Sequence, residues 1–329
     1  MQDSILRRVR RLEEMKTQRK SGARNNGAQK SGAGNEGVTL VGLGNWGTAL
    51  ASALFAAGIP IREIVVRTLR EPDHRLAKQW KTRLVTLEGV GRSAVKLGAK
   101  LDAPVLWICT PDAEIARTAA ALARHGIKNS HPVVLHSSGA LASLELAALR
   151  DAGASLASAH PLMSFPNRTS FPNRVAASLA GVPFAIEGEA RAVRVARRLV
   201  RQLGGEPFSL RAEDKAMYHA YATFTSPLVT ALLTAAQAAG VAAGLSKAEA
   251  ARRMRPIVER TVENFFREGV AQSLSGPVAR GDAATVARHL AVLKPNPSLQ
   301  EIYRALQAFA VTALPGKRKP ELRKILKRS

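Results

Sequence analysis

From Val38 onward, short apolar runs alternate with segments in which apolar residues recur every three or four positions. A short apolar run predicts a buried strand, and the wider spacing predicts an amphipathic helix. Strands are expected at 38–41, 64–67, 105–109, 133–136 and 155–159, with another within 84–101 and an edge strand at 182–186. Helices are expected at 46–57, 112–125 and 143–151. The alternation is typical of βαβ units and predicts an α/β domain with a doubly wound parallel sheet.

After about residue 187 the strands nearly stop and amphipathic helices follow. They are expected at 189–203, 212–240, 246–268, 283–294 and 297–313. The sequence therefore predicts a first domain over 38–187 and an all-α second domain over 188–314. Pro227 should bend the long helix nearby. The window from Pro227 to Leu245 is the most apolar in the chain, but it is rich in Ala, Thr and Gly and contains Gln237, so it predicts a buried helix and no membrane span.

Two short basic segments lie at the ends of the sequence. Of the net charge of +24, residues 1–37 carry +5 and residues 315–329 carry +6. Residues 17–37 have almost nothing apolar to bury, and both ends are expected to be disordered basic tails. The excess of basic over acidic residues between these two segments suits phosphate-bearing ligands or nucleic acid. A single cysteine, Cys109, excludes an internal disulfide and favours the cytoplasm; no signal peptide is evident, and the thiol is expected to be buried and inert.

The segment VTLVGLGNWGTAL contains Gly42, Gly44 and Gly47 in G-x-G-x-x-G spacing, after a strand and before a helix. The first glycine allows a tight turn, the second lets backbone approach a pyrophosphate, and the third lets helix pack on strand. Amide groups at the helix start, around Asn45 and Trp46, then face the phosphates. This motif in this setting predicts a Rossmann-type dinucleotide-binding domain.

The second predicted strand ends in VVRTLR, where an NAD-binding domain usually carries an acidic residue. Arg67, Thr68 and Arg70 stand there instead and suit the 2′-phosphate of NADP, so NADP(H) is favoured over NAD(H). Glu63, before the strand end, is a weaker candidate for binding the ribose. The fourth strand ends in CTPDAEI, and Thr110 and Pro111 are expected to border the nicotinamide ribose.

The chain contains seven histidines, and three lie where a dinucleotide-dependent enzyme would need them. His136 ends a strand together with Ser137 and Ser138, and His160 ends the next strand. His219 shares one face of a predicted helix with Lys215. Histidine, or a lysine of lowered pKa, can exchange the proton that accompanies hydride transfer. Each histidine considered alone is more often structural. The sequence shows no metal-ligand spacing and no nucleophile elbow.

The motifs GLGNWG, CTPDAEI, HSSGAL, SAHPLMSF, YHAYATFTSP and SGPVARGDAATVARHL occur in this order between residues 38 and 313. In these motifs the chain resembles bacterial proteins that join a Rossmann-like NADP oxidoreductase domain to a helical domain of unknown function. That family belongs with pyrroline-5-carboxylate reductase, ketopantoate reductase and the 6-phosphogluconate dehydrogenase group. The resemblance implies an NADPH-binding domain, a 6-phosphogluconate dehydrogenase-like C-terminal domain that dimerises, and an active site in the cleft between them.

The resemblance also implies residue roles. The HPL at His160 is similar to the HPM or HPI of prephenate dehydrogenases, whose histidine binds the substrate hydroxyl; Ser137 or Ser138 matches their assisting serine. Lys215 and His219 resemble the Lys-x-x-x-Asn pair of ketopantoate and hydroxyisobutyrate-type enzymes, with His in place of Asn. Arg280 is either a clamp for a substrate carboxylate or part of an Arg-Asp structural turn.

The leading hypothesis is an NADP-dependent oxidoreductase acting on a small keto, imino or hydroxy acid, with His160, Ser138, His136, Lys215 and His219 as candidate catalytic groups. A non-catalytic NADP-binding sensor or scaffold is the alternative. Nucleic-acid binding rests on charge alone, because neither basic tail contains an aromatic residue that could stack on bases. The expected partners are a small-molecule substrate and a second copy of the chain.

Overall fold

The computed structural model describes residues 37–86, 101, 104–129, 131–165, 178–315 and 319–327. The chain forms two compact units, the first ending at Lys215 and the second beginning at Ala216. The predicted N-terminal tail, apart from Gly37, lies outside the described residues. So does most of the segment 84–101, in which the sequence predicted a strand of uncertain position.

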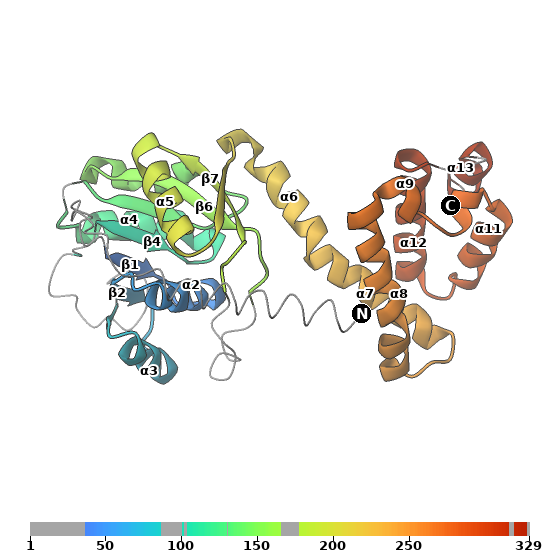
Figure 1. Cartoon of the computed structure of the whole chain (residues 1–329), viewed down its shortest axis with the longest axis horizontal. Helices are drawn as coiled ribbons and strands as arrows, with labels where there is room; N and C mark the ends of the chain where they lie inside the picture. The colour runs from blue at the N-terminus through green and yellow to red at the C-terminus, as the bar shows by residue number, and fades with distance from the viewer. Residues whose placement is uncertain are drawn as a thin grey trace, which may run out of the picture. The chain divides into compact units, whose positions relative to one another are not determined.

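The first unit is built on one eight-stranded sheet in the order β3-β2-β1-β4-β5-β6-β7-β8 (Figure 1). The strands are β1 (Val38–Val41), β2 (Ile61–Val66), β3 (Arg83–Thr86), β4 (Val105–Ile108), β5 (Val133–His136), β6 (Ser155–Pro161), β7 (Pro183–Gly188) and β8 (Glu206–Ser209). All pairs from β3 to β6 are parallel. The order of the first six strands is that of a doubly wound dinucleotide-binding sheet, which confirms the predicted fold class.

The far side of the sheet differs from the expectation. β7 pairs antiparallel with β6 and parallel with β8, so β8 and not β7 is the edge strand. β8 was not predicted, because its residues, EPFS, do not form an apolar run. The helix α5 (Ala190–Gln202) and β8 belong to the first unit. The division by compactness lies at Lys215, whereas the predicted domain boundary lies between 187 and 188.

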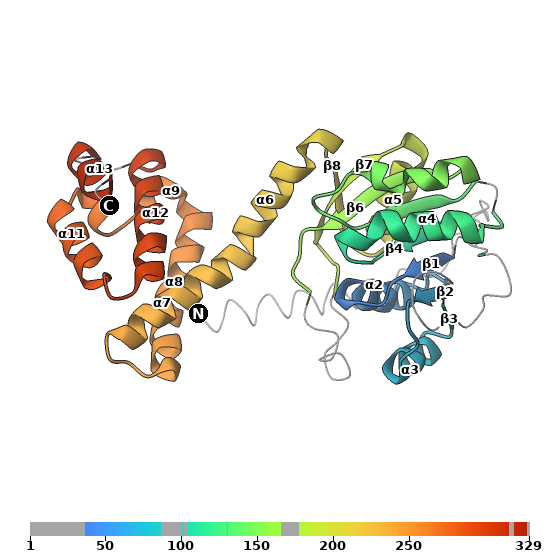
Figure 2. The same cartoon turned by 180° about the vertical axis from the view of Figure 1, so that it is seen from behind.

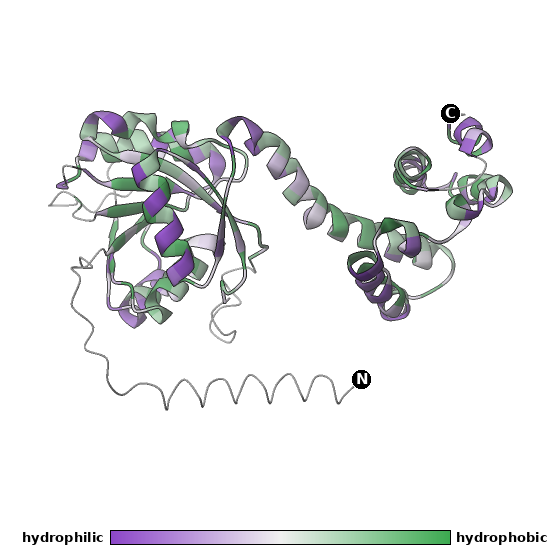
Figure 3. Ribbon diagram, turned by 45° about the horizontal axis from the view of Figure 1, so that its top comes forward, coloured by the Kyte–Doolittle hydropathy of each residue, from purple (hydrophilic) through white to green (hydrophobic). Residues whose placement is uncertain are grey.

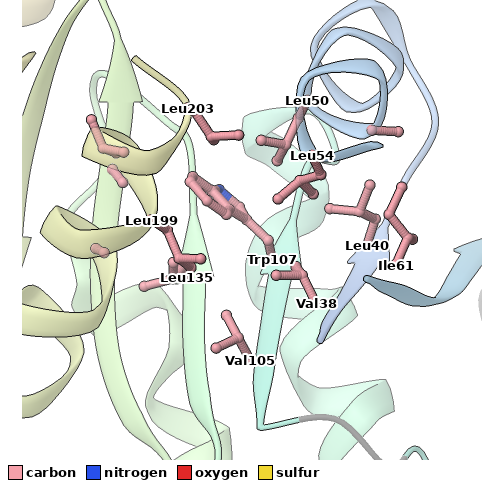
Figure 4. Packing of buried hydrophobic residues seen from close by; sticks show 14 of the residues in the cluster. Val38, Leu40, Leu50, Leu54, Ile61, Val105, Trp107, Leu135, Leu199 and Leu203 are labelled. Carbon is pink, nitrogen blue, oxygen red and sulfur yellow. The ribbon is translucent and has the colours of Figure 1, made fainter. Parts of the chain in front are cut away.

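Helices cover both faces of this sheet (Figures 1 and 2). On one face, α2 (Asn45–Ala56) and α5 share a buried cluster with the strands. On the other face, α4 (Ile115–His125) and the 3-10 segment η2 (Ser143–Ala152) pack on Val134 and Leu156. Figure 4 shows Trp107 of β4 among residues from α2 and α5. Its side chain is fully buried, so the middle of the sheet is fixed by packing from both helices. A short helix, α3 (Glu71–Gln79), follows β2.

The second unit is helical, as predicted. Its helices are α6 (Lys215–Thr225), α7 (Pro227–Ala242), α8 (Lys247–Glu268), α9 (Val270–Ser273), α10 (Pro277–Arg280), α11 (Ala283–Val292), α12 (Pro297–Ala313) and α13 (Lys319–Lys327). The predicted helix at 212–240 is divided at Ser226, which has non-helical angles of φ −134° and ψ −75°. Pro227 follows directly, and a residue before proline avoids the helical region. α8 begins with a capping box formed by Ser246 and Glu249.

The C-terminal basic segment is not the disordered tail that its composition predicted. Residues 319–327 form α13, in which Leu322 and Leu326 are buried in a small core with Val286, Leu290 and Val311. The two leucines are four positions apart and lie on one helical face. Because lysine and arginine make up much of this helix, its composition predicted disorder, although Leu322 and Leu326 form an apolar stripe along one face.

α7 also differs from the prediction of a buried helix, because none of its residues is buried in the described chain. Leu228, Val229 and Leu232 are each more than 40% exposed. Figure 3 shows the hydrophobic colouring along this helix. The stretch Ala212–Ala242 is long and apolar enough, by length and composition alone, to cross a membrane. One helix of this kind is weak evidence for a membrane span, since soluble proteins contain such helices too.

Candidate active site

The glycine-rich turn after β1 has the geometry that phosphate binding requires. Gly42 has φ +102°, a conformation that residues with a side chain rarely adopt. A Cβ atom on Gly47 would overlap the carbonyl oxygen of Gly42, so only glycine lets α2 start this close to the strand. A Cβ on Gly44 would meet no atom within 4 Å. The space in front of Gly44 is therefore open to a ligand.

The N-terminus of α2 is available to an anion. Its N-cap residue is Gly44, and no side chain caps the first turn. The first amides of a helix have no partner within the helix and carry the positive end of its dipole. An uncapped helix start beside an open glycine turn is a suitable site for a pyrophosphate.

A pocket of about 440 Å³ lies in front of this turn. It is lined by eight of the ten residues predicted to bind the cofactor: Gly42, Gly44, Asn45, Arg67, Thr68, Arg70, Thr110 and Pro111. The hydroxyl of Thr110 is buried and has no hydrogen-bond partner among the described residues. A bound ligand could supply the missing partner.

Two predicted cofactor residues do not line the pocket. Gly47 is buried beneath the turn, where it has the packing role expected of the third glycine. Trp46 packs in an aromatic cluster, with ring centroids 4.8 Å from Phe165, 6.2 Å from Trp107 and 6.1 Å from Phe184. Glu63 is also absent from the lining and forms an ion pair with Arg83.

Three polar residues of the pocket were not predicted: Asp73, Glu114 and Thr118. Asp73 comes from the first turn of α3 and is only 2% exposed. It lines the same pocket as Arg67 and Arg70, which are both exposed. The end of β2 is therefore basic at the surface, with a buried carboxyl below. Asp73 lies beyond the position where an acidic residue was sought, which explains why the motif did not reveal it.

A second group of polar residues crosses the carboxyl end of the sheet. His136 is the register partner of Ser158 on β6, and Ser158 is that of Glu187 on β7. Register partners on adjacent strands point to the same face. All three residues are buried. Ser158 and Glu187 were not predicted as site residues, although Ser158 lies two positions before His160.

Lys215, at the start of α6, completes this group. Its side chain is 1% exposed, and Nζ donates hydrogen bonds to the carbonyl oxygen of Ser138 (2.8 Å) and to Oγ of Ser158 (2.7 Å). Burial lowers the pKa of Lys215 to about 8, and the charges of Glu187 and Asp112 partly oppose this shift. A lysine whose pKa lies near neutrality can exchange a proton during catalysis.

His136 is bound at both ring nitrogens. Nδ1 accepts a hydrogen bond from the amide of Ser138 (3.1 Å), so Nε2 carries the proton and donates it to the carbonyl oxygen of Ala142 (3.1 Å). Burial, and secondarily the charge of Lys215, lowers the pKa of His136 to about 4. The ring is neutral at physiological pH and holds the loop after β5 in place.

The serines of the HSSG motif are also engaged. Oγ of Ser138 donates to the carboxylate of Asp112 (2.8 Å) and accepts from the amides of Ala140 and Leu141. Oγ of Ser137 accepts a hydrogen bond from the indole of Trp107 (2.8 Å). Asp112 follows Pro111 of the cofactor pocket directly in sequence. Its bond to Ser138 therefore connects the pocket wall to the residue whose carbonyl oxygen binds Lys215.

The remaining predicted residues are His160, His219 and Arg280. His160, on β6, is half-buried and pairs in register with Ala185. His219 and Arg280 belong to the second unit. Arg280 is exposed at the end of α10. Asp282, which caps α11, has its pKa lowered first by hydrogen bonds from Thr285 and to a smaller extent by the charge of Arg280. Among the described residues, no group of three or more His, Cys, Asp or Glu could hold a metal ion.

Comparison with known proteins agrees with this architecture. Residues 182–309 match the model of a domain of unknown function, DUF2520. No curated protein matches the chain. Among solved structures, BF3122 from Bacteroides fragilis, provisionally described as an NADP oxidoreductase, is 17% identical and has a TM-score of 0.66 over 88% of this chain and 100% of its own.

Two further structures extend this picture. Protein TM1727 from Thermotoga maritima is 21% identical, with a TM-score of 0.62 over 88% of this chain and 98% of its own. An imine reductase from Myxococcus stipitatus in complex with NADP+ is 16% identical, with a TM-score of 0.57 over 88% of this chain and 100% of its own. These likenesses establish the fold, a Rossmann-type sheet followed by a helical C-terminal region.

Proposed function

We propose that the protein is an NADP(H)-dependent oxidoreductase that transfers a hydride to or from a small keto, imino or hydroxy acid. The observation that carries the proposal is Lys215, a buried lysine of lowered pKa, held at the carboxyl end of the same sheet that forms the dinucleotide pocket. Hydride transfer to a carbonyl or imine carbon leaves charge on the heteroatom, which must gain a proton. Lys215 can supply that proton.

The cofactor supplies the hydride when it is bound, and the chain's own residues do the remaining work. The turn at Gly42 to Asn45 would hold the pyrophosphate, and Thr110 and Pro111 would border the nicotinamide ribose. With a pKa of about 8, Lys215 is mostly protonated at pH 7 and donates a proton from Nζ in the reductive direction. In the oxidative direction the neutral amine accepts it. His160 and Ser137 would then orient the substrate, and His219 and Arg280 are the candidates of the second unit for contact with it.

We propose a preference for NADP(H), because Arg67, Thr68 and Arg70 line the pocket and two of them are cations. Isothermal titration of NADPH and NADH measures this directly. Replacing Arg67 by Ala should weaken NADPH binding about tenfold or more with little change for NADH, since a charge-assisted hydrogen bond contributes about 1.5–3 kcal/mol. Tighter binding of NADH than NADPH by the unaltered protein would contradict the preference.

The catalytic proposal is tested by NADPH oxidation across a panel of small keto acids and cyclic imines. The substrate that turns over should lose most of its kcat in Lys215→Met, which removes the proton but keeps an apolar side chain of similar length. Binding of NADPH, measured by nicotinamide fluorescence, should be unchanged in this variant. If no compound turns over and Lys215→Met alters no cofactor-linked signal, the enzyme proposal is wrong.

A non-catalytic NADP sensor is the second candidate. It is favoured by the engagement of His136 and Ser138, because two groups predicted to be catalytic hold the loop instead. Saturable NADPH binding that persists unchanged in a Lys215→Ala, His219→Ala double variant, together with no turnover, would support this role.

We also propose that the protein is a homodimer in the cytoplasm. Support comes from the apolar side chains that the second unit leaves exposed: Met217, Tyr221, Phe224, Leu228, Leu232, Phe265 and Phe266. Large apolar side chains exposed in such numbers are typical of a surface that another chain covers. Light scattering of the purified chain should give twice the monomer mass, and Phe224→Glu should shift it toward monomer. A monomer mass for the unaltered protein would contradict the dimer, and its recovery only in the membrane fraction would contradict the cytoplasmic location.

A further inference from the structure

Ser158 has no role in the proposed chemistry so far, yet it is fully buried beside the amine of Lys215. Its Oγ lies 2.7 Å from Nζ of Lys215 and 3.2 Å from the carbonyl oxygen of Ser138, which also accepts a bond from Lys215. These three atoms form a closed triangle. The hydroxyl proton of Ser158 is directed at the carbonyl oxygen, so its oxygen accepts from Lys215.

An ammonium group has three N–H donors. In Lys215, two of them bind Ser138 and Ser158, and no third hydrogen-bond partner is present among the described residues. The two committed hydrogens are also those that a neutral amine retains. The third position, which is a proton in one state and a lone pair in the other, is therefore the position left for exchange with a substrate.

We propose that Ser158 is a positioning residue that fixes the orientation of the Lys215 amine, so that a single N–H is presented for proton transfer. This inference rests on the proposed function, in which Lys215 handles the proton. Without the Ser158 hydroxyl, the amine keeps one anchor, the carbonyl oxygen of Ser138, and can rotate about its terminal bond. The ammonium form of Lys215 then also loses one of its two hydrogen-bond acceptors.

Other titratable groups also face the Lys215 amine, and their influence on its pKa must be distinguished from that of the Ser158 hydroxyl. Glu187 on β7 and Asp112 next to Ser138 favour the ammonium form, whereas burial opposes it. His136 on β5 is neutral at physiological pH and adds no charge. Because a Ser158 variant leaves all three groups in place, a change in the titration of Lys215 can be attributed to the hydroxyl.

The test begins with the titration of Lys215 in the full-length protein, without substrate. The protein is labelled with [ε-13C]lysine, and the Lys215 resonance is identified by its loss in Lys215→Arg. In Ser158→Ala, the pKa of Lys215 should fall by about one unit or more, because the charged form loses a hydrogen bond. Ser158→Thr, which restores a hydroxyl, should return it. Ser155→Ala, on the same strand but outside the triangle, should leave it unchanged.

Turnover provides the second readout, with any panel substrate that reacts. The limb of the kcat pH profile that reports the titration of Lys215 should shift to lower pH in Ser158→Ala. It should shift back to its original pH in Ser158→Thr, and the KM for NADPH should stay constant in both variants. If Ser158→Ala does not fold, Ser158→Cys provides the same test, since sulfur is a much weaker acceptor. An unchanged Lys215 titration in the folded variant overturns the proposal. A shifted titration in a protein that turns over no substrate would instead contradict the proposed function alone.

Discussion

The two glycines that flank the start of α2 should respond differently to the same one-methyl substitution. In Gly47→Ala, the new methyl group meets the backbone carbonyl of Gly42 and comes within 3.3 Å of Cβ of Cys109, so α2 must move away from the sheet. Overpacking of this kind costs about 1–3 kcal/mol. For a unit of this size, that lowers Tm by roughly 2–4 °C per kcal/mol.

Gly44→Ala should spare the fold and damage binding. Gly44 has φ −80° and ψ −162°, which any residue can adopt, and its methyl would meet no atom. The stability loss should stay below about 1 kcal/mol, because alanine is only a poorer N-cap than glycine. The methyl occupies the space through which a pyrophosphate approaches the amides. Each amide-phosphate bond contributes about 1.5–3 kcal/mol, so NADPH should bind about ten- to a hundredfold more weakly.

Thermal melting without cofactor and NADPH titration by nicotinamide fluorescence separate the two effects. Gly47→Ala should melt several degrees lower than the unaltered protein, and Gly44→Ala close to it. If Gly44→Ala binds NADPH as the unaltered protein does, the turn is not the phosphate site. If Gly47→Ala has the same Tm as the unaltered protein, α2 does not lie as close to the sheet as described.

Three further outcomes are expected. Leu322→Ala should lower the free energy of unfolding, measured in urea, by about 2–5 kcal/mol, because Leu322 of α13 is fully buried. Lys324→Ala, at an exposed position of the same helix, should change this free energy by less than about 0.5 kcal/mol. Equal effects of the two substitutions would contradict the packing of α13. His136 has a pKa of about 4 when folded and 6.5 as the reference value, so the unfolded state binds more protons between these values. Stability should fall by up to about 3 kcal/mol from pH 6.5 to 4, and this slope should be reduced in His136→Gln. Asp73→Asn removes a buried negative charge near the Arg67 side of the pocket, so the NADPH-to-NADH affinity ratio should rise by about threefold or more in paired titrations; a fall would show that Asp73 orients the basic residues.

Much of the first unit could be predicted from the sequence because its signals are local. Apolar runs identified β1, β4 and β5, because buried strands consist of apolar residues. The glycine spacing located the turn after β1, because its positive φ requires glycine. The second unit was less predictable. Its helices follow from periodicity, but the exposure of α7 does not, because a helix rich in Ala and Leu has the same pattern whether its own chain or another covers it.

The sequence by itself determined the α/β class and the glycine-rich turn, and it indicated Lys215 as a candidate for proton transfer. Only the tertiary structure decided which residues give that lysine its chemistry. Ser138 lies 77 positions before Lys215 and Ser158 lies 57 positions before it, and neither spacing produces a local pattern. The strand register aligns His136, Ser158 and Glu187. Glu187 reaches this group because β7 pairs antiparallel with β6. Burial, a property of the packed fold alone, then lowers the pKa of Lys215.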